Sequence, residues 1–268
     1  MDNPPPVALT IAGSDSGGGA GIQADLKTFQ AFGVFGCSAI TAVTAQNTKG
    51  VEAVHGIPGD VVRAQIDAVV DDLAPAAVKS GMLGTAALVA TVAECIRRHG
   101  LDNYVLDPVM VSTSGHRLLD DGAVDEIRND LMPLATVVTP NLHEAGILTG
   151  RVLEGPDDLA QAGLDLLEMG ARVALIKGGH LEGDEAVDVL VTNQGQRTWS
   201  RPRIDTAAGH GTGCTLSAAL TAGLALGMSL EDSTDAAIDF VARALREAPA
   251  LRAGNGPINH FLPGIPGD

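Results

Sequence analysis

The sequence predicts an α/β fold, a three-layer α/β/α sandwich around a mostly parallel central sheet. Short apolar runs alternate with segments of helical periodicity along almost the whole chain of 268 residues. Only 3% of the residues are aromatic, so the core must be built from Ala, Val, Leu and Ile, which suits buried parallel strands. Because successive strand and helix patterns are the signature of βαβ units, helices are expected on both faces of the sheet.

The elements follow in order. Strands are expected at residues 7–12, 38–45, 77–79, 104–106, 136–138 and 173–176. Helices are expected at residues 21–32, 61–73, 85–99, 122–131, 159–169, 215–226 and 230–245. The β-rich segments 187–192 and 197–200 flank Asn-Gln-Gly, which predicts an antiparallel edge hairpin near residues 186–200. No linker or repeat interrupts the pattern, so one domain of residues 7–268 is expected behind a disordered, proline-rich tail of residues 1–6.

Composition narrows the classes of function. The net charge of −16 disfavours a nucleic-acid backbone or an anionic membrane as partner, so a small molecule is expected instead. Three cysteines without CxxC spacing support neither a disulfide scaffold nor structural zinc, which suits a reducing cytoplasm. No apolar run approaches the ~20 residues of a membrane span, and the N-terminus lacks the order of a signal peptide.

The most informative stretch is Gly-His-Gly-Thr-Gly-Cys at residues 209–214, directly before an apolar helix. Glycines let backbone N–H groups turn toward one point, and a helix N-terminus adds partial positive charge there. Gly211, Thr212 and Gly213 are therefore expected to form an anion hole with Cys214 at its rim, where a thiolate would be favoured. The alternative is a loop that merely enters a core helix.

Other small and polar residues follow the predicted strands. The glycine run at residues 17–21 formally overlaps a dinucleotide fingerprint, but no acidic residue ends the second strand. Two interpretations of this run remain open. It could be a backbone cradle for a small ligand, with Asp25 close by, or a plain tight turn. Asp107 and Glu144 could bind Mg²⁺ directly or through waters, although Asn141 and Glu144 also fit a helix capping box. Lys177 could neutralise a phosphate or be a solvated lysine at a turn.

These features share one property, because all of them follow strands of one predicted sheet. Ligands of parallel sheets bind at the carboxyl ends of the strands. An anion hole, a lysine, two carboxylates suited to a metal ion and a cradle for a small molecule are the parts that phosphoryl transfer requires. No Gly-Lys-Ser/Thr sequence occurs, so a Walker A loop is excluded.

The stretches GGAGIQADLKT, TAVTAQNTKGV, LDPVMV, TPNLHEA, HGTGCTLSAA and GPINHF, in this order, resemble the hydroxymethylpyrimidine/phosphomethylpyrimidine kinases of thiamine biosynthesis, within the ribokinase-like superfamily. The resemblance implies ATP and Mg²⁺ as cofactors, a homodimer, and phosphorylation of 4-amino-5-hydroxymethyl-2-methylpyrimidine and then of its monophosphate. It implies a pyrimidine pocket lined by Gly13, Ala20, Asp25, Gln46, Met82 and Val109. It places Lys177, Asn141 and Gly179 at ATP, Asp107 and Glu144 at the metal, and Cys214 where related sugar kinases have an aspartate base.

Two other functions remain possible. A pyridoxal kinase would share the fold and the anion hole with a different pocket, and a non-catalytic pyrimidine or nucleotide sensor would share the fold alone. Residues 112–114 read Ser-Thr-Ser, where many of the relatives carry a lysine.

Overall fold

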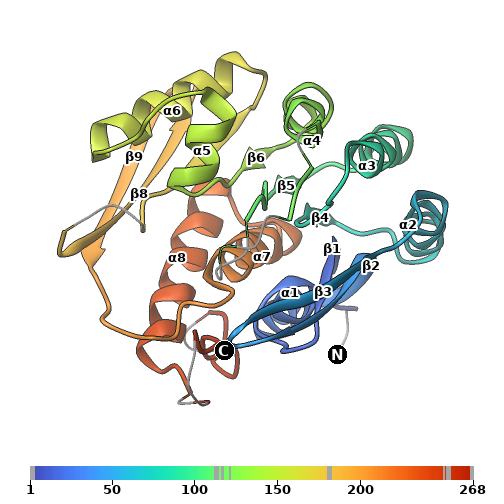
Figure 1. Ribbon diagram of the computed structural model, residues 1–268, viewed down its shortest axis with the longest axis horizontal. Helices are drawn as coiled ribbons and strands as arrows, with labels where there is room; N and C mark the ends of the chain where they lie inside the picture. The colour runs from blue at the N-terminus through green and yellow to red at the C-terminus, as the bar shows by residue number, and fades with distance from the viewer. Residues whose placement is uncertain are drawn as a thin grey trace.

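One continuous mixed sheet organises the chain. The structure is a computed structural model that describes residues 4–111, 115, 118–120, 122–179, 183–249, 251 and 255–265. Within these residues the sheet has nine strands, in the order β3-β2-β1-β4-β5-β6-β7-β8-β9 (Figure 1). Residues 1–3 of the expected tail, the Ser-Thr-Ser of residues 112–114 and His180 lie outside the described residues.

The strands are β1 (Val7–Asp15), β2 (Phe35–Asn47), β3 (Gly50–Gly56), β4 (Ala77–Ser80), β5 (Tyr104–Leu106), β6 (Val137–Val138), β7 (Val173–Lys177), β8 (Glu185–Thr192) and β9 (Gly195–Pro202). The α-helices are α1 (Gly21–Ala31), α2 (Gly59–Leu73), α3 (Ala86–His99), α4 (Ala123–Glu126), α5 (Leu142–Thr149), α6 (Pro156–Glu168), α7 (Thr212–Ala225) and α8 (Leu230–Arg246). A π-helical turn at Ile127–Leu131 and a 3-10 turn at Met132–Leu134 continue α4.

The predicted fold class is confirmed. Strands β2, β1, β4, β5, β6 and β7 run parallel to one another, while β8 pairs antiparallel with β7 and forms the expected antiparallel hairpin with β9 at one edge. The opposite edge holds a second hairpin, because β3 pairs antiparallel with β2. Strand β3 was not predicted from the sequence, because most of its residues are exposed and its sequence lacks the apolar alternation of a half-buried strand.

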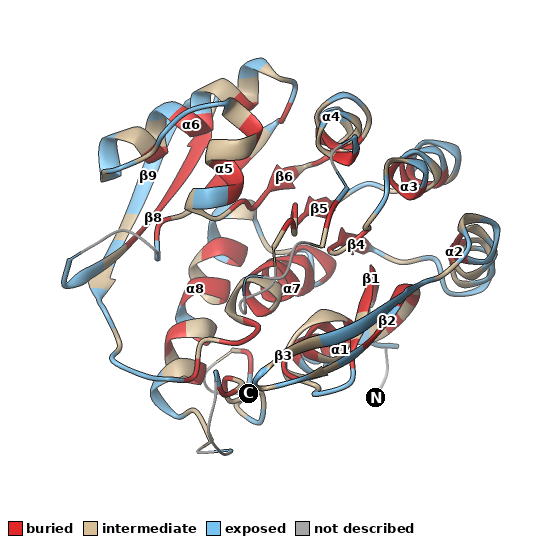
Figure 2. Cartoon of the chain, viewed as in Figure 1, coloured by how far each residue is buried: buried red, intermediate tan, exposed pale blue. Residues whose placement is uncertain are grey.

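Two apolar layers cover the two faces of the sheet. Leu9, Ile11 and Leu106 face α2, α3 and α6 on one side of the sheet. The residues that precede Leu9 and Leu106 in the strands, Ala8 and Val105, point to the opposite side and face α1, α7 and α8. Figure 2 shows the buried residues on the strands and on the inward sides of the helices. Helix α7 lies deepest, since all eleven residues from Thr215 to Ala225 are buried. Its N-terminus is thereby fixed beneath the ends of the strands.

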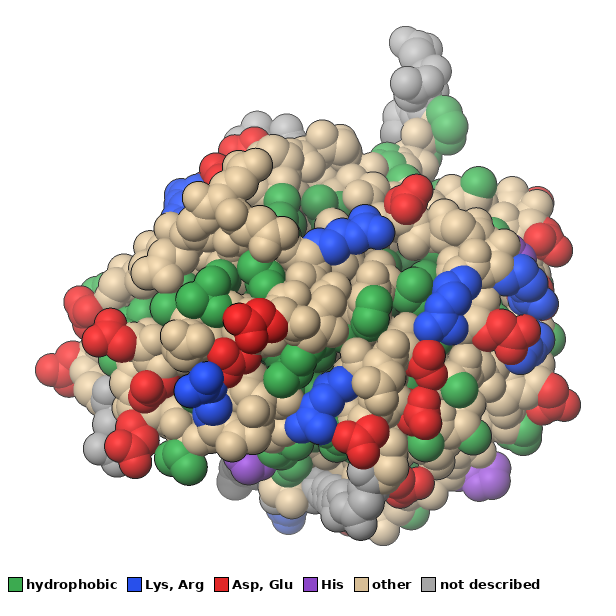
Figure 3. All heavy atoms as spheres, turned by 90° about the horizontal axis from the view of Figure 1, so that it is seen from above, with side chains coloured by type: hydrophobic (Ala, Val, Ile, Leu, Met, Phe, Trp, Pro, Cys, Tyr) green, Lys and Arg blue, Asp and Glu red, His purple; other side chains and the backbone are tan. Residues whose placement is uncertain are grey.

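Acidic and basic side chains are mixed on the face of the molecule seen in Figure 3. Figure 3 shows Asp and Glu side chains scattered over one face, with Lys and Arg side chains among them rather than gathered into a basic patch. Among the helices of the described residues, none has the length and apolar character needed to cross a membrane.

Candidate functional site

A cavity of about 600 Å³ lies at the carboxyl ends of the parallel strands. It is bounded by the ends of β1, β4, β5 and β7 and by the first turn of α7. Of the fifteen residues singled out from the sequence, fourteen line it: Gly13, Ala20, Gln46, Met82, Asp107, Val109, Asn141, Glu144, Lys177, Gly179, Gly211, Thr212, Gly213 and Cys214. The topology therefore brings together residues that are up to about 200 positions apart in the chain.

The stretch 209–213 forms the N-terminal entry of α7. Gly211 is the N-cap with φ of +85°, a backbone conformation that favours glycine, and a Cβ there would lie 1.8 Å from the carbonyl oxygen of Gly19. At Gly213 a Cβ would lie 3.2 Å from Nζ of Lys177. The ammonium of Lys177 therefore lies beside the first turn of α7, and a cation next to a helix N-terminus suits an anion.

Asp107 is buried, and both of its carboxylate oxygens accept hydrogen bonds. Its Oδ1 accepts from Lys177 Nζ at 2.9 Å, and its Oδ2 accepts from Ser217 Oγ at 3.1 Å. Burial opposes the charge of Asp107, but the two lysines near it, Lys177 and Lys79, outweigh that effect and lower the pKa of the carboxyl. Burial would likewise lower the pKa of Lys177, yet Asp107 and Glu144 raise it. Both groups are therefore charged at neutral pH.

Glu144 sits in the capping box that the sequence suggested. Asn141 N donates to Glu144 Oε2 at 2.8 Å, and Glu144 N donates to Asn141 Oδ1 at 2.9 Å, which starts α5. Burial raises the pKa of Glu144 to about 7, against the lowering effect of Lys177. The described residues contain no group of three or more His, Cys, Asp or Glu side chains placed to hold a metal ion. A metal held by Asp107 and Glu144 would need water or ligand oxygens as well.

Cys214 corrects one expectation. The helix N-terminus was expected to favour the thiolate, but burial raises the pKa of this thiol to about 12, and Asp107 and Asp25 add to the effect. The ammonium of Lys79 and the backbone N–H of Gly21, which begins α1, act in the opposite direction without overcoming burial. The thiol of Cys214 is therefore neutral at physiological pH.

At the other end of the cavity, β1, β2 and β4 supply an apolar floor with one amide. A Cβ at Gly13 would lie 3.1 Å from Met82 Sδ, so the backbone of Gly13 packs against that thioether. Gln46 comes from the end of β2, Ala20 from the loop before α1, and Val109 from the segment after β5.

Asp25 is the one predicted residue that the structure does not bring to the cavity wall. It is fully buried, with Oδ1 accepting from Lys79 Nζ at 2.9 Å and Oδ2 accepting from Thr10 Oγ1 at 2.6 Å. Lys79 separates it from the cavity, which Lys79 itself lines. A lysine in the middle of a four-residue buried strand was the signal in the sequence that could have revealed this pair.

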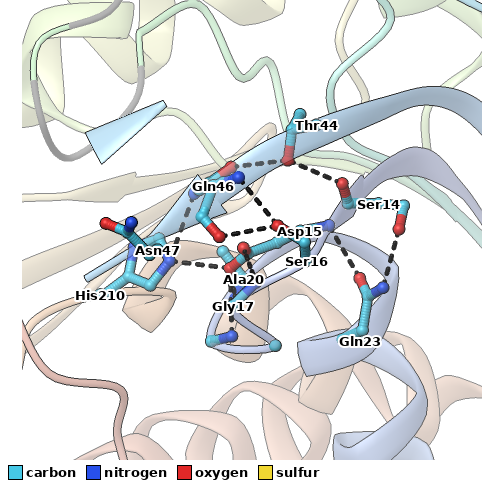
Figure 4. A network of polar contacts seen from close by, with 12 residues as sticks. Ser14, Asp15, Ser16, Gly17, Ala20, Gln23, Thr44, Gln46, Asn47 and His210 are labelled. Atoms are coloured by element: carbon cyan, nitrogen blue, oxygen red, sulfur yellow. Dashed lines mark hydrogen bonds and ion pairs between the residues drawn. The ribbon is translucent and has the colours of Figure 1, made fainter. Parts of the chain in front are cut away.

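Asp15 and His210 are a second pair that the sequence analysis missed (Figure 4). His210 Nε2 lies 2.9 Å from Asp15 Oδ2 and 3.4 Å from Gln46 Nε2. The far wall of the cavity was missed as well and includes Arg201, Arg203, Ile204, Val241 and Leu245. Val241 and Leu245 lie on α8, an ordinary amphipathic helix, and nothing in the local sequence indicates that they line a cavity.

Known proteins resemble this chain over most of its length. A family model described as phosphomethylpyrimidine kinase matches residues 15–259. A hydroxymethylpyrimidine/phosphomethylpyrimidine kinase of Rhizobium meliloti (strain 1021) is 49% identical, over 95% of this chain and 97% of that protein.

Two solved structures are similar to the chain. A phosphomethylpyrimidine kinase from Clostridium difficile 630 is similar with a TM-score of 0.80 and 42% identity, over 89% of this chain and 99% of that one. An ADP complex of pyridoxal kinase from Bacillus subtilis is similar with a TM-score of 0.89 and 40% identity, over 96% of this chain and 98% of that one. Overall structural similarity alone therefore does not distinguish a phosphomethylpyrimidine kinase from a pyridoxal kinase.

Proposed function

The chain belongs to the phosphomethylpyrimidine kinase family, and from that membership and the cavity we propose that it is an ATP-dependent phosphotransferase of thiamine biosynthesis. Its acceptors are 4-amino-5-hydroxymethyl-2-methylpyrimidine and then the monophosphate of that compound. The observation that carries this proposal is a single cavity that joins a small apolar pocket holding Gln46 to a cationic helix N-terminus.

The acceptor ring fits the end of the cavity at Gly13, Met82 and Val109. The side-chain amide of Gln46 both donates and accepts hydrogen bonds, which suits an amino group beside a ring nitrogen. ATP fits the opposite end, where Ile204, Val241 and Leu245 form an apolar wall for the base. Its phosphates then lie toward Lys177, Asn141 and Gly179.

The transferred phosphoryl group would lie between Lys177 and the first turn of α7. The N–H groups of Thr212 and Gly213 and the ammonium of Lys177 would stabilise its charge, with the N–H of Thr212 leaving its long contact of 3.5 Å with the carbonyl of Gly209. Asp107 holds the ammonium, and the buried helix holds the turn. A Mg²⁺ ion bound with ATP would supply positive charge against the phosphates. Asp107 and Glu144 would hold it through waters.

Cys214 is the proposed proton acceptor for the substrate hydroxyl. Because its thiol is neutral at physiological pH, only a small thiolate fraction is available, and positioning with charge stabilisation carries most of the rate. Proton removal contributes less in a loose phosphoryl transfer, in which little covalent chemistry falls to the protein.

The proposed assembly is a cytoplasmic homodimer of one kinase domain, residues 7–268. The exposed apolar side chains of Phe35, Val43 and Val54 on β2 and β3 offer a surface for a second copy. Sedimentation at micromolar concentration tests this, since a monomer mass would contradict it.

The decisive experiment measures ADP release with Mg-ATP and identifies the products by mass. The hydroxymethylpyrimidine, its monophosphate and pyridoxal are offered separately. Turnover of both pyrimidine species is expected. Turnover of pyridoxal alone would assign the chain to the pyridoxal kinase activity of its structural relative. Binding without turnover of any of them would favour a sensor.

A further inference from the structure

Four residues form a ring of contacts at the N-terminal end of α7. Lys177 Nζ donates to Asp107 Oδ1 at 2.9 Å, and Ser217 Oγ donates to Asp107 Oδ2 at 3.1 Å. Ser217 lies four residues after Gly213 on the same face of α7, and a Cβ at Gly213 would lie 3.2 Å from Lys177 Nζ. The ammonium of Lys177 therefore lies beside the same helix to which its carboxylate partner is bound.

The hydroxyl hydrogen of Ser217 belongs to the contact with Asp107. The carboxylate of Asp107 is ion-paired with an ammonium and carries no hydrogen, so an oxygen at 3.1 Å stabilises it only as a donor. Ser217 Oγ also lies 3.2 Å from the carbonyl oxygen of Gly213 and 3.0 Å from that of Cys214. A hydroxyl has one hydrogen, and a charged carboxylate accepts it more strongly than a neutral carbonyl does.

Backbone pairing alone does not fix the ends of these side chains. The backbone N–H groups of Asp107 and Lys177 donate to carbonyls of neighbouring segments at 3.0 and 2.9 Å, which places the two main chains. The ammonium of Lys177, however, sits at the end of a flexible four-carbon stem. On the carboxyl of Asp107, the hydroxyl of Thr139 makes only a long contact of 3.4 Å with Oδ1. The hydrogen bond from Ser217 to Oδ2 is therefore what stops this carboxyl from turning and taking the ammonium with it.

We propose that Ser217 is a positioning residue for phosphoryl transfer, which holds the ammonium of Lys177 beside the first turn of α7 by anchoring Asp107 to that helix. The side chain of Ser217 is fully buried and is not part of the cavity wall, so it acts through these two residues and touches no substrate. A charge held in place stabilises a transition state better than a charge that must first move into position. A loosened ammonium would still attract the phosphates of ATP from several positions, so its loss of position should lower kcat more than it raises KM.

This inference rests on the proposed function, since the phosphoryl group must lie between Lys177 and α7. The test compares the wild-type chain with Ser217→Ala, which removes the hydroxyl with little change of shape. Thr221→Val is the matched control, because Thr221 is equally buried one turn further along α7 and its hydroxyl donates to the carbonyl of Ser217 at 2.7 Å, away from Asp107. For each chain, kcat, KM for ATP, KM for the hydroxymethylpyrimidine and the melting temperature are measured.

Ser217→Ala is expected to lower kcat roughly tenfold, as for one lost hydrogen bond to a charged group, and to leave both KM values within about twofold. Thr221→Val is expected to keep the wild-type kinetic constants, whatever its melting temperature. Lys177→Met removes the ammonium itself and should lower kcat further. Adding Ser217→Ala to Lys177→Met is expected to cause no additional loss of kcat, because no ammonium is then left to position.

Three results would overturn this inference and leave the proposed function standing. The first is a wild-type kcat in Ser217→Ala. The second is an equal loss of kcat in Thr221→Val, since a general disturbance of α7 would then explain both. The third is a loss caused by Ser217→Ala that is as large in the Lys177→Met background as in the wild-type chain.

Failure of the proposed acceptor is a separate outcome. If the wild-type chain phosphorylates pyridoxal and not the pyrimidine, the proposed acceptor falls, and the same variants are compared with pyridoxal, because Ser217 serves the phosphate end of the cavity. If neither compound is phosphorylated, the proposed function falls and this inference falls with it.

Discussion

At the scale of single residues, the balance between burial and neighbouring charges decides which groups of the site are charged. The residue type of Cys214 and its place near the start of a helix could be predicted from the sequence, but the protonation state of its thiol could not. A helix N-terminus favours a thiolate, whereas burial disfavours it, and only the packing tells which effect is larger. Here burial is larger and raises the pKa of Cys214 to about 12.

This state makes the proposed base testable through pH. If the thiolate of Cys214 accepts the proton, its fraction increases tenfold per pH unit as long as the pH stays below that pKa, so kcat is expected to rise steadily between pH 7 and 9.5. Cys214→Ser is expected to lower kcat roughly 10- to 100-fold and to abolish the rise. A wild-type profile that is level over this range would remove Cys214 from the role of base.

His260 provides a second prediction from burial. Its Nε2 lies 2.8 Å from Thr215 Oγ1, and burial, with a smaller effect of Lys27, lowers its pKa from 6.5 to about 4. Between pH 6.5 and about 4, His260 is protonated in the unfolded chain but neutral in the folded chain. The stability contributed by His260 is therefore lost as pH falls from 6.5 toward 4.

His260→Gln keeps a polar partner for Thr215 and cannot be protonated in this range. Between pH 7 and pH 5 the wild-type chain is expected to lose about 1–2 kcal/mol more stability than this variant, measured by urea unfolding. Glu144, whose pKa is raised to about 7, changes stability in the opposite sense in both chains and cancels in the difference. Parallel losses in the two chains would show that His260 is not held neutral.

At the scale of elements, close approach of two loops fixes the entry of α7. The carbonyl of Gly19 fills the space beside Gly211, where a Cβ would lie 1.8 Å away and where φ is +85°. Gly211→Ala is therefore expected to destabilise the fold by roughly 2–4 kcal/mol and to lower kcat at least tenfold, since the loop must move away from the phosphoryl position.

Gly209→Ala is the matched substitution in the same loop. No atom lies within 4 Å of a Cβ built at Gly209, so its effect on thermal unfolding is expected to stay below about 1 kcal/mol. Equal losses of stability in the two variants would mean that the contact with Gly19 does not set the geometry of the loop.

The contact between α7 and α8 contains a polar mismatch. Ser233 Oγ is buried and has no hydrogen-bond partner among the described residues, and Gly223 of α7 leaves just enough room for it. Because a buried unpaired hydroxyl costs about 1–3 kcal/mol, Ser233→Ala is expected to raise the melting temperature by roughly 2–4 °C with activity unchanged. Gly223→Ala, whose Cβ would lie 2.7 Å from Ser233 Oγ, should lower it, and a lower melting temperature in Ser233→Ala would reveal a partner for the hydroxyl.

At the scale of the whole molecule, the sequence was most informative about what lies at the strand ends. Buried parallel strands have apolar sequences, and their carboxyl ends must share one edge, so the sequence alone could place Asp107 and Lys177 in one cavity. Exposed elements and contacts between distant segments could not be predicted from the sequence. Strand β3 has no apolar face, and the sequence of α8 does not indicate which of its residues reach the cavity. Asp15 contacts His210 only after the chain has folded. Asp25 matched a pattern but is turned toward Lys79, beneath the cavity.

The dispersed acidic charge acts on the molecule as a whole and yields the last prediction. A chain of net charge −16 repels an anionic ligand over distances comparable to the Debye length, about 30 Å at 0.01 M salt and 8 Å at 0.15 M. The two proposed acceptors differ by one phosphate, so each serves as the control for the other. With Mg-ATP saturating, kcat/KM for the monophosphate is expected to rise roughly two- to tenfold between 0.01 and 0.15 M salt, while kcat/KM for the uncharged hydroxymethylpyrimidine stays level. A fall with added salt would instead mean that the cations of the cavity, Lys177 and Arg203 among them, control the approach of the phosphate more strongly than the acidic surface does.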